Sequence, residues 1–321
     1  MRGADYFLKR TLFAIVTVFV AITLNFIIFR AAPGDAVTGL RCQFCTVEFK
    51  DQLRAELGLD KSKWEQYWLY LQDLAQGDMG RSFVTREPVV DELIDPLLNT
   101  LPMIALGTVF AIVFGIISGL VAAWRRGTYL DWGNLSFSLL FYSLPTQWLG
   151  LMLLIFFAGT LPVSGISDPF LEFTDPSWWD TFVDRLKHMI LPAATIGIVL
   201  YGEYALIVRS SLMEALSEDY VLTARAKGLR NWAIVWKHAF RASLLPVATL
   251  IALSLGYLVA GAILVEAVFS YPGIGLVTYD AVFERDYPVL QGAFLILTLS
   301  VVFANYIADL LYFKLDPRVA E

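Results

Sequence analysis

Long apolar runs constrain this chain more than any other feature of its sequence. Five of them carry no charged residue and a sixth, 188–208, carries only Glu203; the five are 12–29, 101–124, 135–162, 242–265 and 289–308. As a helix, even the shortest reaches roughly 27 Å, close to the bilayer core thickness of about 30 Å. Because a charge at mid-membrane costs at least about 2.5 kcal/mol, runs of this kind indicate a bilayer. The sequence predicts an all-α, polytopic membrane protein with about six transmembrane helices.

Composition indicates the same class. The chain is 57% hydrophobic and 17% charged, whereas a soluble domain is usually about a quarter charged. Transmembrane strands would show shorter segments of alternating polarity, which these runs lack. The first run is longer than the apolar core of a usual signal peptide. We therefore expect residues 1–30 to remain as an N-terminal transmembrane helix rather than to be cleaved as a leader.

The basic residues indicate an orientation. With the amino terminus in the cytoplasm, more than half of the 24 Lys and Arg side chains lie inside, and the short outer loops hold only Arg185, Lys187 and Arg285. The others fall in residues 30–99, a segment long enough to be translocated regardless of its charge. Both termini are therefore predicted to be cytoplasmic. No basic block is dense enough to indicate a nucleic-acid partner.

Three parts follow from this topology. They are the helix of residues 1–30, an external segment of residues 31–99, and a core of residues 100–321 with five further helices. No stretch has the composition of a separate soluble domain or of a low-complexity linker.

The external segment contains an amphipathic pattern. Ser62 and Glu65 have the spacing of a capping box, Trp64 and Trp68 recur on one helical face, and Gly77 is a suitable helix stop. Two interpretations stay open. The helix could lie on the membrane surface, where Trp and Tyr accumulate, or form part of a docking face for an external partner.

The cytoplasmic loop of residues 209–241 is the most unusual stretch. Its first half is rich in Ala, Leu, Arg, Lys and Glu, which favours a helix up to Lys227, and Gly228 can then end that helix. Beyond the glycine, Trp232 and Trp236 belong to an apolar stripe, which a solvated loop does not need. The sequence predicts two short helices with a glycine corner that project into the cytoplasm.

Residues 218–229, Glu-Asp-Tyr-Val-Leu-Thr-Ala-Arg-Ala-Lys-Gly-Leu, resemble the cytoplasmic coupling loop of permease subunits in ATP-binding-cassette importers, in the dipeptide/oligopeptide/nickel branch. The loop departs from the broader importer pattern because Leu222 and Thr223 replace its Glu-Ala. The resemblance implies that the ATPase-coupling residues are Asp219, Tyr220, Ala224, Arg225, Ala226, Lys227 and Gly228.

Further segments similar to this branch run along the whole chain. In order they are 33–35 (Pro-Gly-Asp), 57–60, 77–82, 143–150, 161–165, 191–193, 269–275 (Phe-Ser-Tyr-Pro-Gly-Ile-Gly), 286–289 (Asp-Tyr-Pro-Val) and 315–318. Each is weak alone, and together they are similar to the first of the two permeases of such a system.

The resemblance implies a type I ABC importer permease fold and a five-part machine. Its parts would be this chain, a second homologous permease, two ATP-binding-cassette ATPase subunits and an external solute-binding protein, in the inner membrane of a bacterium or archaeon. The chain has no phosphate-binding Gly-x4-Gly-Lys-Ser/Thr loop. It is therefore expected to be no enzyme and to hold no cofactor, with ATP and Mg²⁺ bound by the partner ATPases.

The resemblance implies inward movement of a peptide-like solute, and the same branch also carries oligosaccharides and nickel. A gradient-driven secondary transporter would show more intramembrane acids or half-helix repeats. Here there is one such acid and no clear repeat. An intramembrane enzyme would need paired ionisable or nucleophilic residues inside the runs, which are missing.

Three residues inside the runs are candidates for the translocation path. Glu203 could meet a substrate ammonium there, or instead pair with an internal donor or lie near the inner interface close to Arg209. Pro145 and Gln147 interrupt an apolar helix, which can expose backbone groups to a cavity or simply kink the helix.

Cys42 and Cys45 are the two cysteines, and both fall in the external segment. A structural disulfide fits the oxidising side of the membrane, and free thiols are the alternative. A zinc site would need about two more ligands, and the two histidines are placed near opposite faces, so no metal site is expected.

Overall fold

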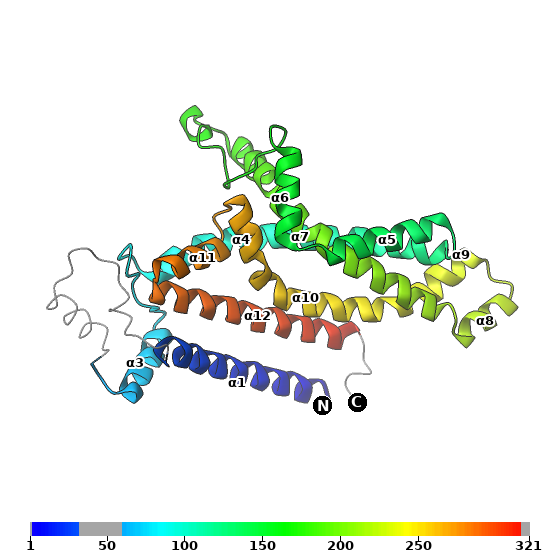
Figure 1. Cartoon of the computed structure of the whole chain (residues 1–321). Coiled ribbons are helices and arrows are strands. Elements are labelled where there is room, and N and C mark those ends of the chain that lie inside the picture. Colours follow the sequence, from blue (N-terminus) through cyan, green and yellow to red (C-terminus); the bar gives the residue numbers. More distant parts are fainter. Residues whose placement is uncertain (1, 32–59, 316–321) are drawn as a thin grey trace.

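The computed structural model describes residues 2–31 and 60–315, which fold almost entirely into helices (Figure 1). The α-helices are α1 (Arg2–Ala31), α3 (Lys63–Ala75), α4 (Val89–Trp124), α5 (Tyr129–Ser143), α6 (Thr146–Phe157), α7 (Trp178–Ala215), α8 (Asp219–Ala226), α9 (Asn231–Ile234), α10 (Phe240–Phe269), α11 (Ile274–Glu284) and α12 (Tyr287–Leu315). A 3₁₀ turn, η1 (Leu171–Thr174), and a π-helical segment, η2 (Val235–Ala239), complete the list.

The prediction of an all-α membrane protein with about six spans is confirmed. Four helices, α1, α4, α7 and α12, are long and apolar enough to cross a membrane, and two bent helix pairs raise the number to six if each pair is one span. α4 and α7, with 36 and 38 residues, reach roughly 54 to 57 Å and so extend well beyond a bilayer core.

The composition of the apolar run 135–162 suggested a single helix, and the structure shows two. It is broken between α5 and α6, whose axes differ by 105°. Leu144 and Pro145 at the break both have extended backbone angles. A proline has no N–H to donate and disfavours helical angles in the residue before it, so the helix ends here rather than kinking.

α4 and α7 form the centre of the molecule, and small residues bring their backbones together. Every fourth residue of α4 from 107 to 123 is small: Gly107, Ala111, Gly115, Gly119 and Ala123. A Cβ on Gly115 would lie 2.5 Å from the Tyr204 Cβ, and one on Gly119 would lie 2.7 Å from the Ala205 carbonyl oxygen. Such spacing lets membrane helices pack closely through van der Waals contact.

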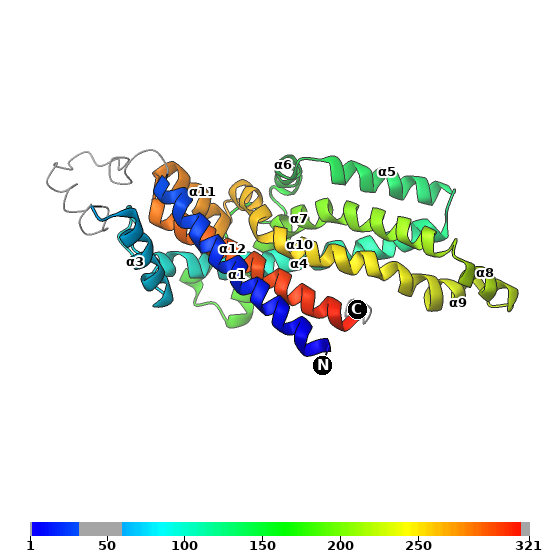
Figure 2. The same cartoon turned by 90° about the horizontal axis from the view of Figure 1, so that it is seen from below.

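α1 packs alongside α12 at the edge of the bundle (Figures 1 and 2). Arg10 pairs with Asp309 at 2.9 Å, and the Asn25 amide donates to the Gln291 carbonyl at 3.0 Å. The other side of α1 is exposed and apolar along most of its length. This helix is the most peripheral of the candidate spans.

α3 lies across one end of α1 in both views (Figures 1 and 2). The predicted capping box is confirmed, since the Ser62 hydroxyl accepts from the Glu65 N–H and the Glu65 carboxylate accepts from the Ser62 N–H. The Tyr67 hydroxyl lies 2.7 Å from the Thr23 hydroxyl of α1. Gly77 follows the helix with φ +81°, as expected of a helix stop.

The two ends of the bundle differ. α8 and α9 lie at one end and α3 and α11 at the other, and the first residues of α1 and the last residues of α12 lie at the ends of these helices remote from α3 and α11 (Figure 1). The start of α1 and the end of α12 therefore point toward the same end of the bundle as the segment predicted to couple to ATPases.

Candidate functional site

The predicted pair of short helices with a glycine corner is present. α8 begins after Glu218 and α9 begins at Asn231, and we call the two helices and their corner, residues 219–234, the knob. The Gly228 N–H donates to the Arg225 carbonyl at 2.9 Å and the Leu229 N–H to the Ala224 carbonyl at 3.2 Å. This is a Schellman ending, whose left-handed position favours glycine, and Gly228 has φ +74° there.

The knob has a small apolar core between its two helices. Val221 and Ala224 of α8 and Ile234 of α9 form a buried cluster of their own, separate from the two larger clusters of the bundle. Of the seven residues that the resemblance indicated for coupling, Ala224 is buried in this cluster. The other six are exposed: Asp219, Tyr220, Arg225, Ala226, Lys227 and Gly228.

The outer side of the knob combines apolar and basic side chains. Its exposed large apolar residues are Leu222, Leu229 and Trp232. Arg225, Lys227 and Arg230 are exposed too, and among the described residues none of the three forms an ion pair. Burial raises the pKa of the Tyr220 phenol, with a smaller contribution from Glu218, so Tyr220 stays neutral near pH 7. An apolar surface with unpaired cations is suited to an acidic protein partner.

The knob is joined to the bundle by helical elements. α7 continues to Ala215 and α10 begins at Phe240, so the connection between them is residues 216–239, within the expected 209–241. η2 leads into α10 as a π-helical segment, which is rare and often marks functional positions. α10 then runs without a break to Phe269, toward the opposite end of the bundle, where α11 continues (Figure 1).

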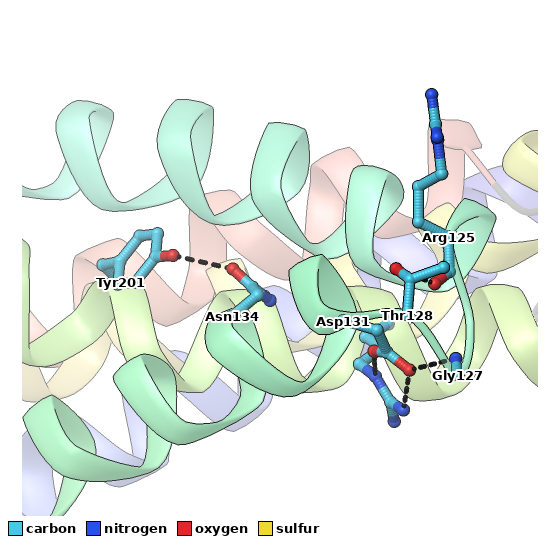
Figure 3. A network of polar contacts seen from close by, with 7 residues as sticks. Arg125, Gly127, Thr128, Asp131, Asn134 and Tyr201 are labelled. Atoms are coloured by element: carbon cyan, nitrogen blue, oxygen red, sulfur yellow. Dashed lines mark hydrogen bonds and ion pairs between the residues drawn. The ribbon is translucent and has the colours of Figure 1, made fainter.

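Arg209 is part of α7 rather than of the loop, and it is engaged by α5. Its Nε lies 2.6 Å from Asp131 Oδ1 and its Nη2 lies 3.0 Å from Oδ2 (Figure 3). Asp131 also accepts from the Gly127 N–H at 2.9 Å, which fixes the turn between α4 and α5. The partner of Arg209 is therefore Asp131, and the role of Glu203 stays a prediction.

The three candidates for the translocation path lie in two parts of the chain, α7 and the start of α6. Glu203 is half-buried in α7, and no described residue is hydrogen-bonded to its carboxylate. Its neighbour Gly202 packs against Ser138 of α5. Pro145 and Gln147 are exposed at the start of α6. Tyr201, two residues before Glu203, donates to the Asn134 amide oxygen at 3.0 Å (Figure 3).

A buried carboxylate that the apolar runs did not reveal lies at the end of α10. Glu266 is fully buried and accepts from the Thr100 hydroxyl of α4 at 2.6 Å and from the Leu276 N–H of α11 at 2.9 Å. The run 242–265 ended one residue before it, so the sequence placed Glu266 in an outer loop. A carboxylate three residues before the Phe-Ser-Tyr-Pro-Gly-Ile-Gly segment was the signal that could have revealed it.

The glycines of that segment leave the space that the Glu266 carboxylate occupies. A Cβ on Gly273 would lie only 2.3 Å from Glu266 Cδ, and one on Gly275 would lie 2.8 Å from Glu266 Oε2. Positive φ does not explain the glycine at position 273, because Gly273 has φ −104° and it is Ser270 that takes the left-handed conformation in this turn, at φ +46°. The glycines are required by space rather than by backbone angle.

A second buried carboxylate joins two segments noted separately in the sequence. Asp286 accepts from the Ser82 hydroxyl at 2.5 Å and from the Phe83 N–H at 3.2 Å. It also caps the start of α12. The segments 77–82 and 286–289 therefore meet, although more than 200 residues separate them. Glu266 and Asp286 lie at opposite ends of α11.

Cys42 and Cys45 lie outside the described residues, so their disulfide stays a prediction. Within residues 2–31 and 60–315, no group of three or more His, Cys, Asp or Glu side chains is placed to hold a metal ion.

Comparisons with known proteins cover almost the whole chain. Residues 111–321 match the family described as binding-protein-dependent transport system inner membrane component, and residues 4–104 match its N-terminal companion family. The di/tripeptide transport system permease protein DppB of Pseudomonas aeruginosa is 38% identical over 332 residues, with 98% of each chain covered. The glutathione transport system permease protein GsiC of Escherichia coli K12 is 34% identical over 318 residues, again with 98% of each chain covered.

A solved structure has the same fold. A chain of the MetNI methionine ABC transporter, in inward-facing conformations, matches with a TM-score of 0.56 at 19% sequence identity. The match covers 99% of that chain and 72% of this one.

Proposed function

The chain belongs to the binding-protein-dependent transport system inner membrane component family, and we propose that it moves peptides into the cytoplasm as one of two permease subunits of an ATP-driven importer. The observation that carries the proposal is the knob. It is a small, rigid unit at one end of the bundle, with an exposed apolar and basic surface and a continuous helix behind it.

The motor of such an importer lies in other chains. Two ATPase subunits bind ATP and Mg²⁺, and one of them grips the knob. Closure of the ATPases moves the knob as a rigid body, and α7 and α10 transmit the movement into the membrane. Asp131 and Arg209 hold α5 to the last turns of α7, so α5 follows the same movement.

Peptides are the favoured solutes because the relatives that this chain matches over 98% of its length are named for dipeptides, tripeptides and glutathione. All three solutes carry an ammonium and carboxylates. Glu203, half-buried in α7, offers a negative charge for the ammonium along the path. A second permease, facing α5, α6 and α7, completes that path, and an external solute-binding protein delivers the solute. Oligosaccharides and nickel are the alternatives that a solute screen would reveal.

Gly228→Val tests the grip on the knob. A β-branched residue strains the left-handed position, and within this chain a Cβ there meets nothing within 4 Å. The membrane body should therefore still fold. We expect normal membrane abundance, uptake lowered by at least about tenfold, and weakened ATPase binding or solute-stimulated hydrolysis, since a 1.4 kcal/mol loss of interface free energy is tenfold.

Gly77→Val is the matched control. Gly77 also follows a helix with a Schellman ending, has φ +81°, and has no atom within 4 Å of its Cβ position. It lies at the other end of the molecule, after α3. Equal defects in both variants would mean that backbone strain alone is responsible. Unimpaired uptake in Gly228→Val would overturn the proposal, as would uptake that persists without the ATPases and collapses with an ionophore.

A further inference from the structure

α10 connects the two ends of the molecule as a single element. It starts directly after the knob and η2, and its last turn carries Glu266. Beyond it the chain turns through 82° into α11. A movement that enters α10 at the knob therefore arrives at the turn between α10 and α11. What holds that turn decides whether α11 follows.

Glu266 ties three helices together at this turn. Its carboxylate accepts from Thr100 of α4 and from the first turn of α11, while the Thr100 hydroxyl oxygen accepts from the Ile274 N–H at 3.0 Å. The Asn99 amide of α4 adds a bond to the Pro272 carbonyl at 2.9 Å. The first turn of a helix is where N–H groups lack partners, and a carboxylate there also meets the positive end of the helix dipole.

Stability alone does not account for a carboxylate in this position. Burying a charged or polar group costs free energy that its partners only offset, and apolar residues of similar volume often serve a core as well or better. Apolar packing is available here, because Ile274 and Ala281 of α11 are already buried in the core cluster that contains Phe269. Unlike apolar packing, hydrogen bonds to the two carboxylate oxygens are directional. They therefore fix both the distance and the angle of α11 relative to α10 and α4.

The side of α11 that faces away from the core carries large side chains. Tyr279, Val282 and Phe283 are exposed on it. Its far end is held by Asp286 to residues 82–84, so the helix is fixed at both ends by buried carboxylates. A helix held in this way moves as a rigid piece.

From this arrangement we propose that Glu266 is a positioning residue that couples α10 to α11, so that ATP-driven movement of the knob opens and closes the solute entrance at the opposite end. The proposal rests on the proposed function. Thr100 is its partner, and the Pro-Gly-Ile-Gly segment is the socket that admits the carboxylate.

Thr100→Val tests the coupling with a small change. It removes the hydroxyl that bonds Glu266 while keeping the side-chain volume. Thr108→Val is the matched control, because Thr108 is also buried in α4 but bonds only the Ile104 carbonyl of its own helix, at 2.8 Å. Glu266→Gln is a third variant, which keeps the side-chain volume and one of the two acceptor oxygens but replaces the other oxygen with an NH2 donor and removes the charge. All are assayed in the complete importer in proteoliposomes, as peptide imported per ATP hydrolysed, with a spin label at Val282 reporting on α11.

We expect Thr100→Val and Glu266→Gln to lower peptide import per ATP by about tenfold, the factor expected when a hydrogen bond to a charged group is lost in a two-state equilibrium. Basal hydrolysis should persist, and the label should no longer respond to ATP with vanadate. Thr108→Val should resemble the wild type.

Two other results have separate meanings. Wild-type import per ATP in both Thr100→Val and Glu266→Gln, or a spin label that still responds, would overturn the coupling role and leave the proposed function standing. A wild-type importer that takes up no peptide and whose label ignores ATP would overturn the proposed function itself. A purely structural role would instead lower membrane abundance without changing import per ATP.

Discussion

Arg209 and Asp131 form a two-pronged ion pair between α7 and α5, with Nε and Nη2 at 2.6 and 3.0 Å from the two carboxylate oxygens. The side chains are 19% and 5% exposed. The pair lies two turns before the end of α7, where the chain leaves for the knob. It therefore fixes the base of the knob to the start of α5.

Removing one partner of this pair should be costly. Arg209→Leu leaves the Asp131 carboxylate buried without its cation, which we expect to lower stability by about 3–5 kcal/mol. Arg10→Leu is the comparison, because the Arg10–Asp309 pair is 42% and 33% exposed and should contribute about 0–1 kcal/mol. Thermal unfolding of the two purified variants in detergent measures the difference. Similar losses of stability would contradict the importance assigned to burial.

Gly115 of α4 should not tolerate even a methyl group. Its Cβ position lies 2.5 Å from the Tyr204 Cβ, so Gly115→Ala must force α4 and α7 apart. Overpacking of this kind costs about 1–3 kcal/mol. Gly133→Ala in α5 is the control, because a Cβ there meets nothing within 4 Å and alanine favours a helix. A fluorescence-based melting assay should show a lower Tm for the first variant only.

Sequence reasoning predicted the helical class and the knob because their signals are local. An uncharged run long enough to cross a bilayer is visible residue by residue, and so is the helix-stop pattern that ends at Gly228. The capping box of Ser62 and Glu65 was visible for the same reason, since its partners are three residues apart. The stripe of small residues in α4 also has a local signal, because the small residues recur every four positions. A search for uncharged runs does not detect this spacing.

Long-range polar contacts could not be predicted in this way. Ser82 and Asp286 are far apart in the sequence and have no local pattern that pairs them. Glu266 was assigned to solvent because a carboxylate ends an apolar run, yet hydrogen bonds from Thr100 and from the start of α11 allow it to be buried. The cost of burying a charge depends on its partners, and partners from other helices are not visible in the sequence.

α3 is expected to lie in the membrane interface. Trp64 and Trp68 are 73% and 57% exposed, on a face next to the one through which Tyr67 packs on α1. α1, on which α3 packs, also exposes apolar side chains along most of its length. Trp side chains are favoured where apolar tails meet headgroups. A bimane probe on a cysteine at position 68 should be quenched by lipids with a nitroxide near the headgroup.

The exposed polar position Asp73, labelled in the same way, should be quenched much less. Both cysteines are introduced in a protein that lacks Cys42 and Cys45. If position 68 is shielded only after the external solute-binding protein is added, and lipid nitroxides have no effect, α3 is a docking face for that protein and the interfacial prediction is wrong.

The orientation of the bundle is the last prediction, and the proposed function depends on it. Lys61, just before α3, and Ala226, at the end of α8, are both exposed and lie at opposite ends of the molecule (Figure 1). The exposed cations Arg225, Lys227 and Arg230 should keep the knob in the cytoplasm, since basic residues resist translocation. In intact cells, a membrane-impermeant maleimide should therefore label a cysteine at position 61 and spare one at position 226. Labelling of both after solubilisation in detergent shows that neither is hidden by the fold. The reverse pattern in intact cells would place the knob outside, where no ATP-hydrolysing partner could reach it.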